Sequence, residues 1–443
     1  MSEAIEANAS DALREKLERK TARVSVIGLG YVGLPMAVEL GKAGFTVAGI
    51  DVSEKKVGTI DAGESDIRDV PAFEVAGLRA TGKLTATTDY SVVGDSDAII
   101  ICVPTPLSKT RDPDVSYIMD ACGHIRDHLR PGQLIILEST TYPGTTQEIV
   151  LPLMEETGLT VGQDFFLAYS PERIDPGNKT YTLTNTTKIV GGTTPMCSEI
   201  AVLFYSQVIS EVVPVSSTQA AEITKLLENT FRSVNIALVN EVALMCDRLE
   251  IDVWEVISAA ATKPYGFMPF YPGPGLGGHC IPIDPHYLAW KLRTVDFQSR
   301  FIELASEVTR SMPEYVVTKV SDILNLFERS VKGSSILVLG VTYKPNVGDI
   351  RESPALDIVE LLRRKGAHVT YHDPFVERIS ADGLDMEGVT LDSDTVSSAD
   401  CVLITTNHDS YDYQWIVDHA KCVYDTRNAT SGLTETVGKV FKL

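Results

Sequence analysis

The chain has 443 residues, of which 44% are hydrophobic and 22% are charged, a balance typical of a folded protein with two or three domains. Its formal charge of −21 argues against a nucleic-acid partner, because such proteins usually carry a basic surface. The sequence has no apolar run long enough to span a membrane, and the polar stretch Ser2 to Arg23 is unlike a signal peptide, so we expect a cytoplasmic protein.

A dinucleotide-binding pattern opens the folded part of the chain. A buried parallel strand is predicted at residues 23–28, followed by a helix at 34–43 and a second strand at 46–50 that ends in Asp51. The turn between the first strand and the helix reads GxGxxG, with Gly28, Gly30 and Gly33. Glycines let the backbone approach a pyrophosphate, the helix N-terminus attracts its charge, and the acid binds the ribose hydroxyls. Asp51 favours NAD over NADP, whereas a glycine turn that only packs a helix on a strand would leave the acid unexplained.

Further strands are predicted at 97–103, 133–138, 165–169 and 211–215, with a helix at 115–129. In an open parallel sheet, ligands bind at the carboxyl ends of the strands. The strand-end residues that can contact a cofactor or a substrate there, or merely cap a strand, are Thr105, Glu138 and Thr140.

A helix of about thirty residues is predicted at 217–248, and a helix this long usually spans domains or forms an oligomer interface. Lys225 and Asn229 are four residues apart and therefore share a face. The alternative is an ordinary exposed ion pair between Lys225 and Glu222. The apolar, amide-rich surroundings favour a partly buried lysine instead.

The segment 272–284 contains four glycines and three prolines, which predicts a tight loop. Cys280 lies near its end, between His279 and Asp284. It is either an exposed nucleophile or a small buried hydrophobic residue. The seven cysteines of the chain include no CxxC pair, which favours reduced thiols over disulfides or a zinc site.

Helices are predicted at 253–261 and at 299–328, where Pro313 would bend the second helix or break it in two. A second α/β unit follows, without a GxGxxG motif. Its predicted strands and helix lie at 333–340, 353–365, 368–372 and 398–406. The loop after its first strand carries cations and amides that suit a phosphate or sugar ligand.

With these pieces assembled, the sequence resembles the UDP-glucose/UDP-N-acetylhexosamine 6-dehydrogenase family from about Val24 to the end. The motifs that carry the resemblance are GLGYVGLP at 28–35, VPTP at 103–106, EST at 138–140, SPER at 170–173, KLLEN at 225–229, GPGLGGHCIPIDP at 273–285 and YKPNVGDIRESPA at 343–355. The resemblance implies two doubly wound α/β domains joined by a long central helix. We expect an NAD-binding domain at 1–215, a central helical domain at 216–328 that forms a homodimer or larger oligomer, and a UDP-sugar-binding domain at 329–443.

The family oxidises the C6 alcohol of a UDP-sugar to a carboxylate with two NAD⁺. The resemblance implies that Cys280 forms the covalent intermediate, that Lys225 and Asn229 stabilise its oxyanion, and that Asp284 holds a water or acts as a base. Glu172 and Thr140 would assist hydrolysis. The residues expected to bind NAD are Gly28, Gly30, Tyr31, Val32, Gly33, Asp51, Thr105, Thr140 and Arg351. Those expected to bind the substrate are Glu172, Arg173, Lys225, Asn229, Tyr271, Gly277 and Lys344.

The stretch SPERIDPG at 170–177 is similar to the N-acetylhexosamine branch of the family, and residues 263–290 are most similar to the UDP-N-acetylglucosamine enzymes of bacterial O-antigen synthesis. We therefore expect UDP-GlcNAc as substrate, with UDP-ManNAc or UDP-glucose as alternatives. A two-electron hydroxyacid dehydrogenase would need neither the cysteine nor a second nucleotide domain. A non-catalytic nucleotide-sugar sensor should lack part of the set Cys280, Lys225, Asn229 and Asp284, all of which are present.

Overall fold

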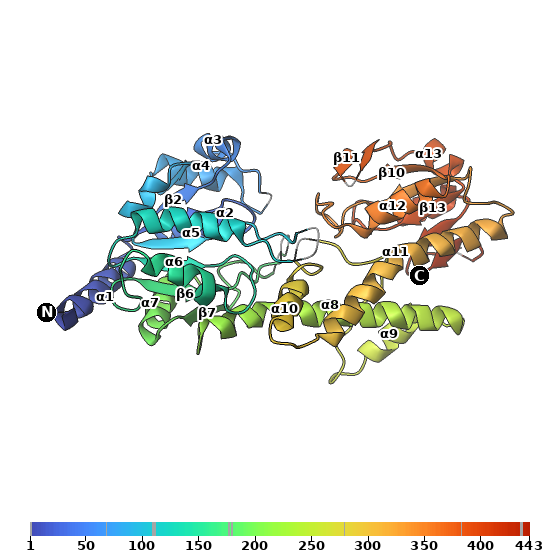
Figure 1. Ribbon diagram of the computed structural model, residues 1–443. Coiled ribbons are helices and arrows are strands. Elements are labelled where there is room, and N and C mark those ends of the chain that lie inside the picture. Colours follow the sequence, from blue (N-terminus) through green and yellow to red (C-terminus); the bar gives the residue numbers. More distant parts are fainter. Residues whose placement is uncertain are drawn as a thin grey trace. The chain divides into compact units, whose positions relative to one another are not determined.

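The computed structural model describes residues 2–67, 69–108, 112–175, 178, 180–278, 280–381, 383–434 and 437–443. The chain forms two compact units, Met1–Glu228 with His286–Asp296, and Asn229–Pro285 with Phe297–Leu443. Each unit is built on a largely parallel sheet covered by helices on both faces (Figure 1). This confirms the predicted α/β class with two doubly wound domains, and the long helix α8 (Thr218–Arg248) was also predicted.

The first unit contains, among its described residues, an eight-stranded sheet. Its strands are β1 (Arg23–Ile27), β2 (Thr46–Ile50), β3 (Leu84–Thr87), β4 (Ala98–Ile101), β5 (Leu134–Leu137), β6 (Phe166–Tyr169), β7 (Lys188–Gly192) and β8 (Val212–Val215). Their order is β3-β2-β1-β4-β5-β6-β7-β8. β6 and β7 are antiparallel and the other neighbours are parallel, so β7 and β8 run against the first six strands. Neither β3 nor β7 was predicted from the sequence.

Alternate residues of these strands face two separate hydrophobic cores. Ile100 and Ile136 pack in one core, whereas their neighbours Ile101 and Leu137 pack in the other. This alternation follows from the two-residue repeat of a strand, and it requires helices on both faces. The helices of this unit are α1 (Ser2–Glu18), α2 (Gly33–Ala43), α3 (Glu54–Asp61), α4 (Ala72–Ala80), η1 (Tyr90–Asp95), α5 (Ser116–His128), η2 (Thr146–Val150), α6 (Leu151–Glu155) and α7 (Pro195–Tyr205).

The second unit has a smaller sheet, five-stranded and parallel throughout, as far as the described residues show. Its strands are β9 (Ser335–Leu339), β10 (His368–His372), β13 (Cys401–Ile404), β14 (Val423–Asp425) and β15 (Val440–Lys442), in the order β10-β9-β13-β14-β15. β11 (Arg378–Ala381) and β12 (Leu384–Glu387) form an antiparallel hairpin. The helices of this unit are α9 (Val253–Ala261), α11 (Arg300–Leu326), α12 (Pro354–Arg364), α13 (Ser393–Ser398) and α14 (Tyr413–His419), whereas α10 (Asp284–Arg293) belongs mostly to the first unit.

Helix α11 is continuous through Pro313, so of the two predicted outcomes, a bend or a break, the break does not occur. A proline inside a helix removes one backbone hydrogen bond and costs about 3 kcal/mol. Here the helix buries Thr309, Met312, Val316 and Val317 around the proline. The burial of apolar side chains on both sides of Pro313 stabilises the helix enough to carry it across this position.

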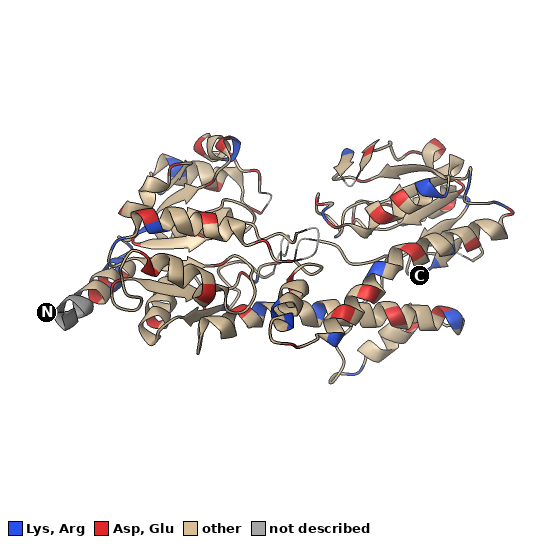
Figure 2. Cartoon of the chain, viewed as in Figure 1, with Lys and Arg blue, Asp and Glu red and all other residues tan. Residues whose placement is uncertain are grey.

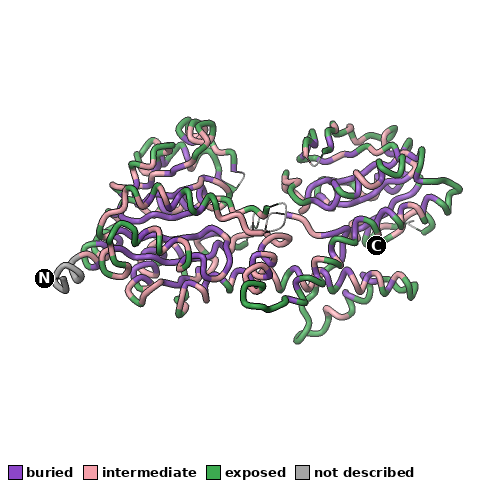
Figure 3. The backbone as a smooth tube through the Cα atoms, viewed as in Figure 1, coloured by how far each residue is buried: buried purple, intermediate pink, exposed green. Residues whose placement is uncertain are grey.

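Figure 3 shows the central strands of both sheets as buried, with exposed residues on the outer sides of the helices and in the loops. In the view of Figure 2, acidic and basic residues are interspersed over the helices of both units. Among the described residues, helices that combine the length and the apolar character needed to cross a membrane are absent.

Candidate active site

The turn after β1 has the geometry of a dinucleotide cradle. Gly28 has a φ of +89°, and a β-carbon there would lie 2.6 Å from the carbonyl oxygen of Cys102. A β-carbon on Gly33 would lie 1.8 Å from the Gly28 carbonyl oxygen. Gly30 differs, because a β-carbon there would have nothing within 4 Å. Two of the three glycines are therefore required by packing, whereas Gly30 leaves the surface of the turn open for a ligand.

Asp51 lies at the end of β2 beside this turn. One carboxylate oxygen accepts a hydrogen bond from the backbone N–H of Leu29 at 2.9 Å, and the other accepts one from Ser53 N–H at 2.9 Å. The side chain is only partly buried. Tyr31, which is 47% exposed, and Val32 lie in the same turn, directly before α2. The predicted cofactor residues of the first motif therefore surround one helix N-terminus.

Thr105 follows β4, and its backbone carbonyl accepts a hydrogen bond from the buried Tyr287 hydroxyl at 2.6 Å. This contact fixes the loop that carries the VPTP motif.

A buried ionic cluster occupies the carboxyl ends of β5 and β6. The Lys188 ammonium lies 2.8 Å from Glu138 Oε1 and 3.1 Å from Glu172 Oε2. The Tyr205 hydroxyl donates to Glu138, and the Cys102 thiol donates to the same carboxylate at 3.7 Å. Glu138 is only 1% exposed and contacts protein groups, which favours the second of its two predicted roles, a structural one at the strand end, over contact with a ligand.

Lys225 lies on α8 and is 8% exposed. Its ammonium donates to Thr140 Oγ1 at 2.5 Å, which brings together two predicted site residues of the first unit. Glu222 does not form the alternative ion pair with Lys225. It accepts hydrogen bonds from the backbone N–H groups of Gly144 and Thr146, at 2.5 and 2.9 Å.

Arg173 forms a two-point ion pair with Glu228 of α8, at 2.6 and 3.2 Å, and also donates to the Thr187 carbonyl at 2.7 Å. These contacts tie the SPER segment to the helix and to the start of β7.

In the second unit, Cys280 is the partly exposed member of the seven cysteines, and the other six are buried. Its carbonyl accepts hydrogen bonds from the N–H groups of Ile283 and Asp284, at 3.0 and 2.7 Å, so the cysteine lies one turn before α10. Asp284 is 2% exposed, and it accepts a hydrogen bond from Asn229 Nδ2 at 2.5 Å. His279 lies outside the described residues.

The glycines before Cys280 allow close packing against protein. A β-carbon on Gly277 would lie 2.5 Å from the Glu352 carbonyl oxygen, and one on Gly278 would lie 2.9 Å from the Tyr343 ring. The N–H of Gly278 donates to the Arg351 carbonyl at 3.1 Å. The sequence predicted close approach of the backbone here, and in this structure the approach is to the loop after β9.

The second unit also contains an open cavity of about 310 Å³. It is lined by Trp254, Tyr271, Pro272, Asn407, Arg427 and Asn428. Tyr271 stacks with Trp254 at a ring distance of 6.2 Å. Burial lowers the pKa of Arg427 to about 10, with Asp425 opposing the shift, so Arg427 remains a cation at neutral pH.

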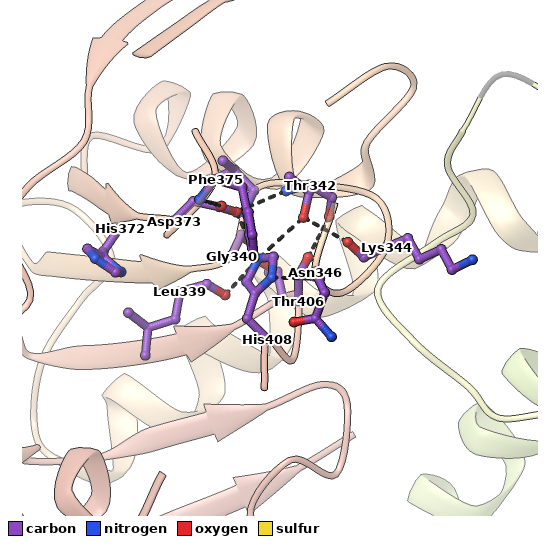
Figure 4. A network of polar contacts seen from close by, with 12 residues as sticks. Leu339, Gly340, Thr342, Lys344, Asn346, His372, Asp373, Phe375, Thr406 and His408 are labelled. Carbon is purple, nitrogen blue, oxygen red and sulfur yellow. Dashed lines mark hydrogen bonds and ion pairs between the residues drawn. The ribbon is translucent and has the colours of Figure 1, made fainter. Parts of the chain in front are cut away.

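The loop after β9 is held by a buried polar network, shown in Figure 4. His408 is fully buried, and its Nε2 lies 3.0 Å from Asp373, while its Nδ1 accepts from the Asn346 N–H at 3.0 Å. The Lys344 carbonyl accepts from Thr342 Oγ1 at 3.0 Å, and Figure 4 shows the Lys344 side chain pointing away from the network.

Arg351 lies on the same loop and is paired with Asp349, at distances of 2.6 to 3.1 Å. It therefore belongs to the second unit, unlike the other predicted NAD residues.

Sequence reasoning missed Lys188, Asn407, Arg427 and Asn428. Lys188 begins a strand that was not predicted. The other three follow β13 and β14 directly, so the rule that ligands gather at the carboxyl ends of strands could have found them.

Residues 22–209 match the NAD binding domain of the UDP-glucose/GDP-mannose dehydrogenase family, residues 219–311 its central domain, and residues 337–432 its UDP binding domain. A UDP-N-acetyl-D-glucosamine 6-dehydrogenase of Pseudomonas aeruginosa is 36% identical over 373 residues, covering 84% of this chain and 86% of that protein. A UDP-N-acetyl-D-mannosamine dehydrogenase of Methanococcus maripaludis is 36% identical over 419 residues, covering 92% of each. The solved structure of a UDP-D-ManNAc dehydrogenase from Pyrococcus horikoshii aligns with a TM-score of 0.86 at 32% identity, covering 95% of this chain and 98% of that one.

This chain belongs to the UDP-glucose/GDP-mannose dehydrogenase family. The protein is therefore an NAD-dependent oxidoreductase that acts on a nucleotide sugar, as the resemblance predicted. The cradle of the first unit fits NAD, because it combines the open surface at Gly30, the N-terminus of α2 and the Asp51 carboxylate.

Proposed function

We propose that this dehydrogenase oxidises the C6 alcohol of a UDP-N-acetylhexosamine to the carboxylate through a covalent Cys280 intermediate, and that UDP-GlcNAc is its substrate. The observation that carries the proposal is the environment of Cys280. Cys280 is partly exposed, whereas the other six cysteines are buried, and it lies one turn before α10. The N–H of Asp284 donates to the Cys280 carbonyl, and the Asp284 carboxylate accepts a hydrogen bond from Asn229. All three residues belong to motifs that carry the family resemblance.

The proposed chemistry has four steps. The C6 alcohol first loses a hydride and a proton and becomes an aldehyde. The Cys280 thiolate then adds to C6, and the oxygen takes a proton to give a thiohemiacetal. Loss of a second hydride from C6, together with the proton of the C6 hydroxyl group, gives a thioester. Water then adds to C6 and displaces the Cys280 sulfur as a thiol, and the acid that is formed loses a proton to leave the carboxylate. NAD, when bound, accepts the hydride in each oxidation, and the covalent bond retains the aldehyde between them.

Helix α8 supplies the two proposed oxyanion donors. Lys225 and Asn229 are one turn apart on it, and both carry N–H groups that can stabilise negative charge on the C6 oxygen. Asp284, held by Asn229, is the proposed base or water-holding group. Thr140 and Glu172 are proposed to place and deprotonate the hydrolytic water.

The proposed NAD site consists of the cradle in the first unit, with Thr105 and Thr140 at neighbouring strand ends. Arg351, in the second unit, is the further residue that the family resemblance assigns to NAD. We propose that the cavity of the second unit receives the UDP group. Arg427 offers a cation to the diphosphate, and the Tyr271 ring offers a stacking surface to the uracil. Gly277, Lys344 and Arg173 complete the proposed substrate contacts.

The finer choice of sugar rests on the motifs at residues 170–177 and 263–290. UDP-ManNAc is the second candidate, because the Methanococcus maripaludis relative is as similar over a larger share of the chain. Initial rates with UDP-GlcNAc, UDP-ManNAc and UDP-glucose, compared side by side, decide between them. A faster rate with either of the other two sugars would overturn the choice of UDP-GlcNAc.

We also propose that a second copy of this chain covers an exposed apolar stripe on α8. Phe231, Leu238 and Met245 are seven residues apart and 48 to 52% exposed. An exposed apolar face of this kind marks an interaction surface, and light scattering of the purified protein tests for a dimer or larger oligomer.

Removing the thiol tests the covalent mechanism. The Cys280→Ala variant should bind NAD and the UDP-sugar as the wild type does but form no uronate, because the second oxidation requires the thiohemiacetal. Uronate is measured by chromatography after overnight incubation. Cys246→Ala is a matched control, because that thiol is buried, and it should retain activity. Uronate formation by Cys280→Ala at a rate near that of the wild type would rule out the covalent route.

A further inference from the structure

Lys188 lies between two carboxylates in the interior of the first unit. Glu138, Glu172 and Lys188 are 1, 9 and 4% exposed, and the ammonium contacts both acids. Taking three charges out of water is unfavourable unless each is paired. Proteins in which apolar residues of similar volume replace such buried charges are often equally stable. Stability alone therefore does not explain this cluster, and because Glu172 is a candidate catalytic group, we consider a functional role for its partners.

The contacts hold Glu172 in a single orientation. Its Oε1 accepts hydrogen bonds from the N–H groups of Arg173 and Ile174, at 2.7 and 2.8 Å. Its Oε2 contacts Lys188 at 3.1 Å. Lys188 is in turn fixed by Glu138, which also accepts from the Tyr205 hydroxyl. Both oxygens of Glu172 thus have donors that favour the ionised form.

We propose that Lys188 is the positioning residue of Glu172, holding its carboxylate ionised and oriented for the removal of a proton from the hydrolytic water. This rests on the function proposed above, in which Glu172 acts on water during thioester hydrolysis. In that step a water proton moves to Glu172 while the oxygen bonds to the C6 carbonyl carbon and the Cys280 sulfur leaves. A protonated Glu172 cannot accept the proton.

The two carboxylic acids of the cluster, Glu138 and Glu172, have pKa values that are shifted in opposite directions. Burial raises the pKa of Glu138, and the charge of Lys188 only partly offsets this effect. Burial also disfavours the ionised form of Glu172, but Lys188, the Ile174 N–H and Lys225 together hold its pKa below the usual value. Of the two carboxylates, Glu172 therefore stays the anion as the pH falls, and Glu138 takes up the proton first.

Ionisable groups reach Glu172 from several elements packed around it. They are Lys188 from β7, Glu138 after β5, Cys102 after β4 and Lys225 from α8, and Tyr205 from α7 belongs to the cluster through its hydrogen bond to Glu138. Burial raises the pKa values of Cys102 and Tyr205, so both remain neutral near pH 7. The cations whose charge lowers the pKa of Glu172 are Lys188, in direct contact, and Lys225, which donates to Thr140.

The experiment compares variants that differ in the cation. Lys188→Met combined with Glu138→Gln removes one positive and one negative charge, so the net charge of the cluster is kept while Glu172 loses its partner. In this double variant, the pH below which kcat falls, which is the acid limb of the pH profile, should rise by about one pH unit or more. The KM for the UDP-sugar should change little. Lys188→Arg keeps a cation and should retain the position of the limb. Glu138→Gln alone keeps the contact between Lys188 and Glu172, and its limb should not move up.

An unmoved acid limb in a folded double variant would overturn the proposal, because a merely structural lysine changes the yield of folded protein and not the pH profile. If the double variant does not fold, infrared difference spectra between the wild type and Glu172→Gln report the protonation of Glu172 directly. The wild type should show an ionised carboxylate at pH 6, and a protonated acid there would equally overturn it. The infrared measurement uses no substrate, so it stands even if the wild type oxidises no UDP-sugar, which is the result that would refute the proposed function itself.

Discussion

The first turns of the two sheets are built alike. In the first unit, Gly28 follows β1 with a φ of +89°, and the next N–H, that of Leu29, donates to Asp51 at the end of β2. In the second unit, Gly340 follows β9 with a φ of +81°, and the N–H of Val341 donates to Asp373 at the end of β10. In both sheets the glycine packs directly against the residues that follow the strand on its other side, β4 or β13.

The two turns differ in what surrounds the acid. Asp51 is partly exposed, and a helix begins five residues after Gly28. Asp373 is 7% exposed, and its carboxylate also accepts hydrogen bonds from His408 and from the Phe375 N–H. Because Asp373 is buried and its carboxylate accepts several hydrogen bonds from the protein, it is closed to a ribose, whereas the partly exposed Asp51 is the proposed ribose contact. The same type of turn is thus open to a cofactor in the first unit and is closed by internal hydrogen bonds in the second.

This difference explains why the candidate nucleotide site of the second unit lies elsewhere. Its cavity is formed by residues that follow β13 and β14 together with Tyr271 and Trp254. The fold provides several strand ends where a ligand can bind, and the side chains decide which of them remains open.

The largest expected effect comes from exchanging each acid for alanine. Asp373→Ala should lower the free energy of unfolding by about 2 to 5 kcal/mol, because it leaves His408 and three backbone N–H groups without their acceptor in a buried site. Asp51→Ala should cost about 1 kcal/mol, because its donors can reach water, but should weaken NAD binding about tenfold or more. Chemical unfolding and calorimetric titration with NAD measure the two effects.

An equal loss of stability in the two variants would contradict the proposed difference between a partly exposed Asp51 and a buried Asp373. An Asp51→Ala variant that binds NAD as tightly as the wild type would contradict it as well, because the open acid would then have no role in the cradle.

A smaller effect separates two glycines of the cradle. Gly33→Ala should destabilise the first unit by about 1 to 3 kcal/mol, because the added carbon overlaps the Gly28 carbonyl oxygen. Gly30→Ala should leave stability within about 0.5 kcal/mol, since nothing lies near the added carbon. It should weaken NAD binding, because the methyl group enters the space over which a pyrophosphate passes. Thermal unfolding with and without NAD distinguishes these outcomes, and a Gly33→Ala protein as stable as the wild type would contradict the packing argument.

Much of the fold could be predicted from local patterns. The predicted strand at 133–138 and helices at 34–43 and 217–248 agree with β5, α2 and α8 to within one residue at each end. Their signals are apolar runs and caps, which are local in sequence. β7 escaped prediction because it begins with a charged residue and ends in two glycines. Lys188 is paired there with Glu138 and Glu172, which are distant in the sequence.

The candidate site was predictable to the extent that motifs name residues. Lys225 and Thr140 come from separate motifs, and the structure brings them into contact at 2.5 Å. The motifs could not say that Asp373 and His408 form a closed pair, because the two residues are 35 positions apart and neither has a spacing signal. Contacts between distant residues remain the part that sequence patterns do not encode.

The count of NADH formed per sugar consumed tests the central claim most directly. The claim is that the Cys280 thiol retains the sugar covalently between two oxidations that each use one NAD⁺. With UDP-GlcNAc in limiting amount, absorbance of NADH at completion and chromatography of the remaining sugar give the ratio. The account predicts two NADH per sugar and a uronate product. A ratio of one, with an aldehyde or ketone as product, would contradict it.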